Sequence, residues 1–210
     1  MTCKVVVLLS GRGSNFRAIA EAQLPIDIVA AISNRPQAAG LEYARSRGIP
    51  AVALDHTAHS DRTLFDALLA EEIERHRPDL VVLAGYMRIL SAAFIARFEG
   101  RLLNIHPSLL PMFPGLKTHE RALEEGVKIH GCTVHFVTAD LDHGPIVIQA
   151  AVPVRADDTP DSLAARVLAQ EHRIYPQAIR WFAEGRLVNS HGRVNLKDDS
   201  TSQSVLSPGT

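Results

Sequence analysis

The chain has 210 residues, of which 46% are hydrophobic and 21% are charged, and its formal net charge is −1. These values describe an ordinary globular domain and argue against a nucleic-acid or anionic-membrane partner. The two cysteines form no CxxC pair, and the first apolar run is only as long as a strand. We therefore expect no zinc or redox motif, no signal peptide and no membrane span, and a cytoplasmic location.

The first half of the chain alternates short apolar runs with amphipathic segments, a pattern typical of βαβ units on a parallel sheet. The expected strands are Lys4–Leu9, Ile26–Ile32, Ala51–Leu54, Leu80–Ala84 and Leu102–His106. The expected helices are Ser14–Ala22, Ala39–Arg47, Asp61–His76 and Ser91–Phe98. The pattern predicts a Rossmann-like α/β fold, in which an open, mainly parallel twisted sheet carries helices on both faces.

The second half begins with prolines that interrupt regular structure, at Pro107, Pro111 and Pro114. A short helix is expected at Thr118–Glu125, followed by strand-like runs at Gly131–Val137 and Pro145–Val154. The loop between these runs spans Thr138–Gly144, so we expect the C-terminal strands to be partly antiparallel. Thr159 is an expected N-cap, with Pro160 in the first turn of a long final helix that ends near Gly185.

The last residues, from Arg193 onward, are polar and show no periodicity, so we expect a frayed or disordered tail. The expected organisation is one domain over residues 1–190 with a tail over residues 191–210. Within the domain we distinguish a first half over residues 1–100 and a second half over residues 101–190.

The first expected strand ends in Ser10-Gly11-Arg12-Gly13-Ser14-Asn15, which we call the glycine loop, directly before a helix. Glycines at this place let backbone N–H groups, backed by the helix dipole, contact a phosphate. A plain tight turn is the other interpretation, because glycine is the usual residue where φ is positive. The loop lacks the third glycine of a dinucleotide fingerprint and the Gly-Lys-Ser/Thr of a Walker loop. Arg35 still leaves an NADP-dependent oxidoreductase as an alternative, since it could contact a 2′-phosphate.

Asn104 and His106 lie two residues apart on an expected strand, so their side chains share a face. Pro107 ends that strand, which places both groups at the carboxyl edge of the sheet, where such folds bind ligands. An amide beside an imidazole suits acyl transfer, because both stabilise an oxyanion and the imidazole can carry a proton. A nearby carboxylate would favour the imidazolium, and by spacing alone Asp140 and Asp142 fit this role equally well.

A metal site is the competing interpretation of this region, because His119, His130, His135 and His143 are near in sequence. None of them has the HExxH spacing. His130 and His135 are an odd number of residues apart on one expected strand, so we expect them on opposite faces. We therefore expect no metal.

Several motifs together resemble the folate-dependent formyltransferases. The segment Asn104-Ile-His-Pro-Ser-Leu-Leu-Pro111, followed by Pro114-Gly115, is similar to the signature of that family, and the glycine loop is similar to its branch that acts on glycinamide ribonucleotide. Further matches are Leu83–Ser91, His135–Pro145 and Gln170–Pro176. The resemblance covers residues 4–190 and implies that residues 1–100 bind the phosphorylated ribonucleotide, whereas residues 101–190 form the catalytic and folate-binding half. It implies transfer of a formyl group from 10-formyltetrahydrofolate, as co-substrate, to the amine of glycinamide ribonucleotide in de novo purine biosynthesis, without a metal.

The resemblance also implies roles for individual residues. It implies Asn104, His106 and Asp142 as the catalytic residues, with Asp142 rather than Asp140 in the catalytic position. It implies Gly13, Ser14, Asn15 and Glu171 as ribonucleotide-binding residues. It implies a folate-binding set of Arg62, Met87, Arg88, Ile89, Leu90, Asn104, Thr138, Ala139, Asp140, Leu141 and Asp142. For Met87–Leu90 alone we would otherwise favour core packing, and for Arg62 a solvated helix start.

Other functions are less well supported by these residues. A tRNA-acting formyltransferase would bring a further C-terminal domain and basic patches, and a formyltetrahydrofolate hydrolase a further N-terminal domain. A non-catalytic ligand-sensing module would not be expected to keep Asn104, His106 and Asp142 together. We expect small-molecule substrates, no nucleic-acid or membrane partner, and a monomer or weak homodimer.

Overall fold

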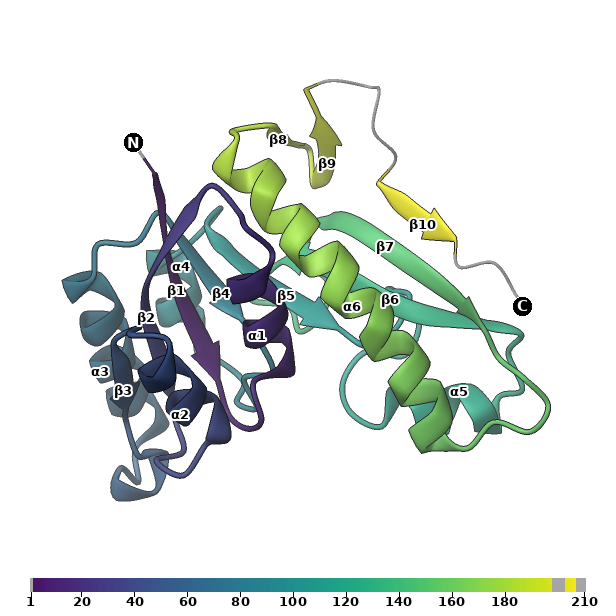
Figure 1. The fold of residues 1–210 in the computed structure, drawn as a ribbon, viewed down its shortest axis with the longest axis horizontal. Coiled ribbons are helices and arrows are strands. Elements are labelled where there is room, and N and C mark those ends of the chain that lie inside the picture. The colour runs from purple at the N-terminus through teal and green to yellow at the C-terminus, as the bar shows by residue number, and fades with distance from the viewer. Residues whose placement is uncertain (1, 198–202, 207–210) are drawn as a thin grey trace. The chain divides into compact units, whose positions relative to one another are not determined.

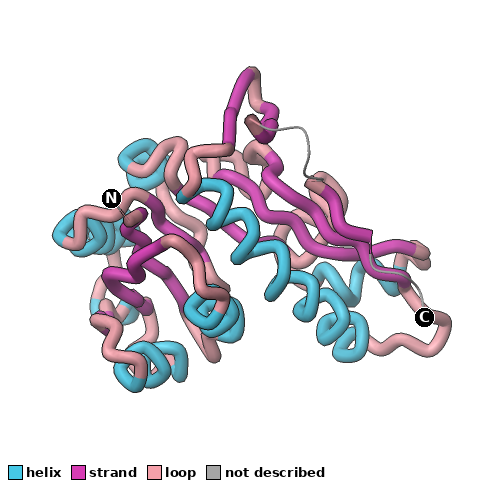
Figure 2. Tube along the Cα trace, turned by 45° about the horizontal axis from the view of Figure 1, so that its top comes forward, coloured by secondary structure: helices cyan, strands magenta, loops and turns pink. Residues whose placement is uncertain are grey.

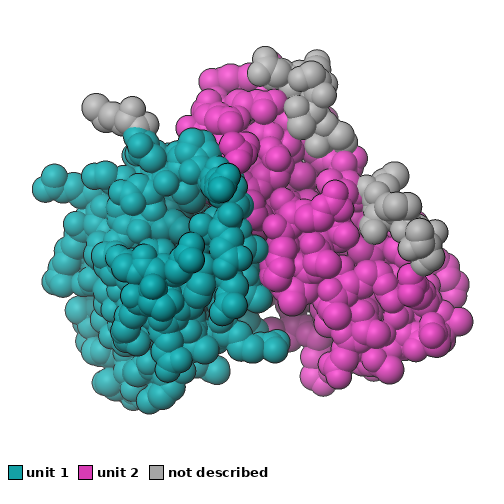
Figure 3. Space-filling model, in the orientation of Figure 1, with its two compact units in different colours: residues 1–104 teal, residues 105–210 magenta. Residues whose placement is uncertain are grey.

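The computed structural model describes residues 2–197 and 203–206. The chain forms two compact units, residues 1–104 and residues 105–210 (Figure 3). The boundary falls inside strand β5 (Leu102–His106), between Asn104 and Ile105, rather than at the expected division after residue 100.

The first unit is built on a parallel sheet with the strand order β5-β4-β1-β2-β3. Its other strands are β1 (Cys3–Leu9), β2 (Ile26–Ser33), β3 (Ala51–Ala53) and β4 (Leu80–Leu83). The side chains of Val5–Leu9 in the central strand β1 are all fully buried. Such a strand is covered on both faces, which explains its uninterrupted apolar run.

Helices cover this parallel sheet in two pairs (Figure 1). They are α1 (Ser14–Glu21), α2 (Ala39–Ser46), α3 (Arg62–Arg75) and α4 (Ala92–Arg97). α1 packs against α2, and α3 packs against α4. Because βαβ crossovers are right-handed and the strand order reverses beside β1, the two pairs lie on opposite faces. The expected helices on both faces are confirmed.

The second unit contains an antiparallel pair, β6 (Ile129–Phe136) and β7 (Ile146–Pro153), which confirms the expected antiparallel C-terminal strands. The long helix α6 (Pro160–Ala183) packs along both strands, as Figure 2 shows, and α5 (Thr118–Glu124) packs against α6. The side chain of Thr159 accepts a hydrogen bond from the Ser162 backbone, which caps α6 at the expected residue.

The C-terminal region differs from the expected disordered tail. β8 (Leu187–Ser190) and β9 (Arg193–Leu196) form an antiparallel hairpin, and β10 (Ser204–Leu206) pairs in parallel with β7. The expectation is wrong for these residues, because Val194 and Leu196 alternate with polar residues and are each only 7% exposed. The rest of the expected tail, residues 198–202 and 207–210, lies outside the described residues.

Sequence-based boundaries agree with the structure to within one or two residues for most elements. The expected helices at Asp61–His76 and Ser91–Phe98 included the capping residues, which flank α3 and α4. Across residues 2–197 and 203–206, the helices are all too short or too polar to cross a lipid bilayer.

Candidate active site

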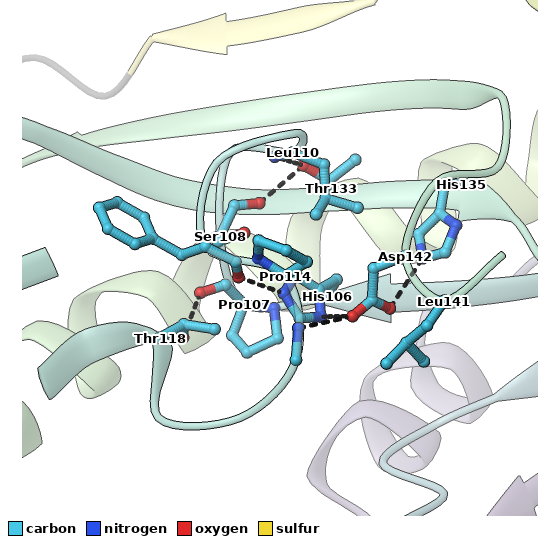
Figure 4. A network of polar contacts seen from close by, with 12 residues as sticks. His106, Pro107, Ser108, Leu110, Pro114, Thr118, Thr133, His135, Leu141 and Asp142 are labelled. Atoms are coloured by element: carbon cyan, nitrogen blue, oxygen red, sulfur yellow. Dashed lines mark hydrogen bonds and ion pairs between the residues drawn. The ribbon is translucent and has the colours of Figure 1, made fainter. Parts of the chain in front are cut away.

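A histidine and an aspartate from distant parts of the second unit lie side by side. His106 is the last residue of β5, and Asp142 lies in the loop between β6 and β7. Nδ1 of His106 is 3.5 Å from Oδ2 of Asp142, and the side chains are 7% and 8% exposed (Figure 4). Because water screens such a buried pair weakly, the electrostatic interaction between the carboxylate and the ring is stronger than it would be at the surface.

The loop conformation places Asp142, rather than Asp140, against the histidine. Asp142 adopts a positive φ of 56°, and its Oδ2 accepts a hydrogen bond of 2.8 Å from the Gly115 backbone N–H. Asp140 is exposed. Spacing alone left the two carboxylates equivalent, and the structure separates them.

Both ring nitrogens of His106 face an oxygen acceptor. Nε2 lies 3.0 Å from the backbone oxygen of Phe113, and Nδ1 faces the Asp142 carboxylate. A carbonyl oxygen can only accept, so Nε2 carries a proton. The two oxygens lie at opposite edges of the ring and fix its orientation.

Asp142 has a second histidine neighbour, His135 on β6. Nε2 of His135 lies 3.9 Å from Oδ1 of Asp142, and Figure 4 shows the carboxylate between the two imidazoles. Nδ1 of His135 lies 2.9 Å from the backbone oxygen of Phe136. Burial lowers the pKa of His135, while Asp142 opposes that shift. Burial therefore disfavours the charged form of His135 more strongly than Asp142 favours it.

Two further histidines, the half-buried His119 and the buried His130, lie near His106. The rings of His119 and His130 pack edge to face at 5.2 Å. Burial lowers the pKa of His130 to about 4 and also lowers the pKa of His119. Besides burial, the charge of His106 lowers the pKa of both His130 and His135, although strict alternation had placed these two side chains on opposite faces. The pairing register shifts between Val134 and His135, so the alternation is interrupted there.

The region around these histidines forms no metal cluster in the described parts of the chain, since no three His, Cys, Asp or Glu side chains there are arranged to hold an ion. His143 is exposed, and its Nδ1 lies 2.7 Å from the Leu141 backbone oxygen.

The proline segment after His106 is fixed by side-chain hydrogen bonds (Figure 4). The hydroxyl of Thr118 donates to the Pro107 backbone oxygen at 2.7 Å. The hydroxyl of Thr133 donates to the Ser108 backbone oxygen at 2.7 Å and accepts from the Leu110 N–H at 3.0 Å. The segment lacks regular structure and is nevertheless held rigidly, which keeps Phe113 and Gly115 in place around His106 and Asp142.

The glycine loop lies in the first unit, where β1 meets α1. Gly13 is the N-cap of α1 and has a φ of 73°, and no side chain caps the helix. A Cβ atom on Gly13 would lie 2.9 Å from the Cα atom of Gly40, so glycine is required for two reasons. Ser14 begins the helix, and Asn15 follows in its first turn. Such a helix start can receive an anion.

The segment Met87–Leu90 follows β4 in the same unit. Met87 and Ile89 are 59% and 58% exposed, whereas Leu90 is buried. Core packing is therefore wrong for Met87 and Ile89, whose exposed apolar side chains are free to contact a ligand. The guanidinium of Arg88 lies over the ring of Phe65 at 4.6 Å, and Arg62 is exposed at the start of α3.

The remaining expected site residues are in the second unit. Thr138 donates to the Asp140 backbone oxygen at 3.2 Å, and Ala139, Asp140 and Leu141 are exposed at the hairpin tip. Glu171 lies on α6 and is only 7% exposed. The pKa of the Cys132 thiol is raised, first by burial and then by the charge of Glu171.

A cavity of about 750 Å³ adjoins the glycine loop at the ends of β1, β2 and β3. Its lining includes Arg12, Arg35 and His56. The sequence had suggested Arg35 as an anion-binding residue, and this cavity provides it with space for a small ligand.

Several site residues were missed by sequence reasoning. The Phe113 carbonyl and the Gly115 N–H act through backbone hydrogen bonds that no sequence pattern indicates. His135 carried a signal, since it begins the matched segment before Asp142, but it was weighed only as a metal ligand.

Comparison with known proteins is consistent with this site. Residues 3–179 match the formyl transferase family. The chain is 53% identical over 187 residues to a phosphoribosylglycinamide formyltransferase of Escherichia coli (strain K12), covering 87% of this chain and 88% of that protein. It superposes on a glycinamide ribonucleotide transformylase 1 from Symbiobacterium toebii with a TM-score of 0.91, 52% identity and coverage of 94% and 95% of the two chains. A phosphoribosylglycinamide formyltransferase from Coxiella burnetii superposes with a TM-score of 0.91, 44% identity and coverage of 99% and 100%.

Proposed function

The chain belongs to the formyl transferase family, and on that premise we propose that it transfers the formyl group of 10-formyltetrahydrofolate to the amine of glycinamide ribonucleotide. The products are formylglycinamide ribonucleotide and tetrahydrofolate, in purine biosynthesis. The observation that carries the proposal is the pair of His106 and Asp142 beside the end of β5.

The chemistry follows from the groups at this strand end. Attack of an amine on a formyl carbon builds negative charge on the formyl oxygen. Asn104 and His106 share a face of β5, and an amide N–H and an imidazolium N–H both stabilise an oxyanion, for which the ring would give up the Phe113 backbone oxygen as its acceptor. Loss of one such donor typically costs about 3–4 kcal/mol of transition-state stabilisation.

The proton movements are assigned to His106 and Asp142. The attacking amine must lose a proton, and N10 of the folate must gain one as the C–N bond breaks. Asp142 orients the ring, His106 gives its proton to N10 as that nitrogen leaves, and the proton lost by the amine returns to His106, so that no proton is gained or lost overall. Gly115 keeps the carboxylate in place by its backbone N–H.

Substrate binding is assigned to segments outside this pair. Backbone N–H groups and polar side chains of Gly13, Ser14 and Asn15 would hold the phosphate, with Glu171 as a further ribonucleotide contact. Arg62 and the exposed apolar side chains of Met87 and Ile89 would contact the folate, together with Arg88, Leu90 and the hairpin residues Thr138–Asp142.

A direct assay tests the proposal. The protein is mixed with 10-formyltetrahydrofolate and glycinamide ribonucleotide, and the change in folate absorbance is followed together with the mass of the ribonucleotide product. The proposal expects a product that is one formyl group heavier, formed in step with tetrahydrofolate. Release of formate without a formylated ribonucleotide would indicate a hydrolase instead.

A further inference from the structure

Ser10, the first residue of the glycine loop after β1, forms a buried junction between three segments. Its hydroxyl donates to Oδ1 of Asn34 at 2.6 Å and accepts from the backbone N–H of Met87 at 2.8 Å. Its own N–H donates to the backbone oxygen of Gly85 at 3.1 Å. Ser10 and Asn34 are 3% and 2% exposed, so water does not compete for these bonds.

The direction of each bond fixes the orientation of the hydroxyl. A serine hydroxyl has one proton to donate, and that proton points to Asn34. A lone pair remains for the Met87 N–H. No other orientation of the hydroxyl satisfies both Asn34 and Met87. A displacement of Ser10 therefore weakens its hydrogen bond with the Met87 N–H.

The two segments joined by Ser10 have separate roles in the proposed function. Ser10 lies in the same loop as Gly13–Asn15, which would hold the ribonucleotide phosphate. Met87 begins the segment Met87–Leu90, which would contact the folate. Both segments belong to the first unit, and the hydroxyl of Ser10 connects their backbones.

The other end of the Met87–Leu90 segment is fixed independently. The backbone N–H of Ser91 donates to Oδ2 of the buried Asp66 at 2.6 Å. The segment is therefore held by Ser10 at its first residue and by Asp66 directly after its last. Of these two anchors, only Ser10 is continuous with the glycine loop.

We propose that Ser10 is a positioning residue that couples the two substrate sites, so that a ribonucleotide bound at the glycine loop tightens the binding of the folate. The inference rests on the proposed function. A phosphate on Gly13–Asn15 restricts the motion of the loop, and Ser10 transmits that restriction to the N–H of Met87. If the first ligand has already ordered these two segments, the second ligand loses less conformational entropy when it binds. The effect is reciprocal, so each ligand raises the affinity for the other by the same factor.

The experiment uses a pair of ligands that cannot react. Tetrahydrofolate carries no formyl group, so its dissociation constant can be measured by calorimetry with and without glycinamide ribonucleotide. In the unaltered protein we expect the ribonucleotide to tighten tetrahydrofolate binding about fivefold or more. In Ser10→Ala the ratio should fall to about one, and Ser10→Thr, which keeps the hydroxyl, should restore it. An unchanged ratio in Ser10→Ala, or a ratio of one in the unaltered protein, would overturn the inference.

Two controls keep the test decisive. Asp66→Ala removes the other anchor, and it should weaken tetrahydrofolate binding equally with and without the ribonucleotide, leaving the ratio unchanged.

If Ser10→Ala does not fold, hydrogen exchange of the Met87 N–H in the unaltered protein replaces it. Ribonucleotide alone should slow that exchange, and an unaffected rate would contradict the coupling. A protein that forms the formylated product without any coupling refutes only this inference, whereas absence of product refutes the proposed function.

Discussion

Nδ1 of His106 lies 3.5 Å from Oδ2 of Asp142, and the two side chains are 7% and 8% exposed. The last residue of a parallel strand thus meets a residue in a later hairpin loop. The Gly115 N–H holds the carboxylate, and the Phe113 backbone oxygen lies against the other ring nitrogen. We therefore expect a change to any of these partners to alter the rate of formyl transfer, because each of them positions His106.

The glycine loop is expected to govern the ribonucleotide and not the folate. Asn15 lies in the first turn of α1 and is only 8% exposed. Asn15→Leu removes a polar group from the helix start and should raise the KM for the ribonucleotide about tenfold or more, with little change in the KM for the folate. Steady-state kinetics with each substrate varied in turn measures this. The exposed Asn189, changed in the same way, is the control. Equal weakening of both substrates would refute the assignment.

The hairpin that carries Asp142 should not tolerate a side chain at Gly144. A Cβ atom there would lie 1.7 Å from the Phe136 backbone oxygen, so Gly144→Ala must displace the loop. We expect a lower melting temperature and a loss of turnover, because Asp142 moves with the loop. The control is Gly11→Ala, because a Cβ atom at Gly11 meets no other atom within 4 Å and its φ is one that other residues adopt. Gly126 is unsuitable as a control, because its φ is positive. Gly11→Ala should keep the melting temperature. A fully stable, active Gly144→Ala variant would show that the hairpin can rearrange freely.

The C-terminal strands should contribute to stability. β9 buries Val194 and Leu196, and the Gln203 side chain donates to the backbone oxygens of Val147 and Val194 at 2.9 Å and 3.1 Å. Burying two such apolar side chains stabilises the fold by about 3–6 kcal/mol at most. A chain that ends at Gly192 should therefore melt several degrees lower than the full chain. Removal of residues 207–210 alone is the matched control. An unchanged melting temperature of the shorter chain would show that the strands add nothing.

Buried His130 should make stability depend on pH. Its pKa is lowered to about 4, first by burial, whereas a histidine in an unfolded chain titrates near about 6.5. Between about pH 6.5 and about pH 4, this histidine is protonated in the unfolded chain but not in the folded chain. The free energy of unfolding therefore decreases progressively as the pH falls through this range. His130→Gln removes this contribution. Urea unfolding of both proteins between pH 7.5 and 4.5 should show the unaltered protein losing more stability on acidification. Parallel curves would contradict the burial of a neutral ring.

The parallel half of the fold could be predicted from sequence because its signals are local. The apolar run at β1, the amphipathic spacing of α3, and the proline after His106 each mark an element without reference to the rest of the chain. The same local reasoning placed Asn104 and His106 on one face of β5.

The remaining features depend on contacts that sequence spacing does not encode. The register shift before His135 interrupts an alternation that otherwise holds along β6. The turn at His191 and Gly192 has positive φ at both residues, and it was overlooked inside a polar segment. The choice between Asp140 and Asp142 required the loop conformation, because residues two apart in a loop have no fixed orientation.

The most direct test of the account is the single-turnover rate of formyl transfer in Asp142→Asn and Asp140→Asn at saturating substrates. Asn keeps the volume of the side chain and removes the charge. If Asp142 supports the charged form of His106, Asp142→Asn should slow transfer about 10²-fold or more at neutral pH, with substrate affinities nearly unchanged. Asp140 is exposed, so Asp140→Asn should transfer the formyl group at the rate of the unaltered protein. A normal rate in Asp142→Asn, with or without a slow Asp140→Asn, would contradict the central role of the His106–Asp142 pair.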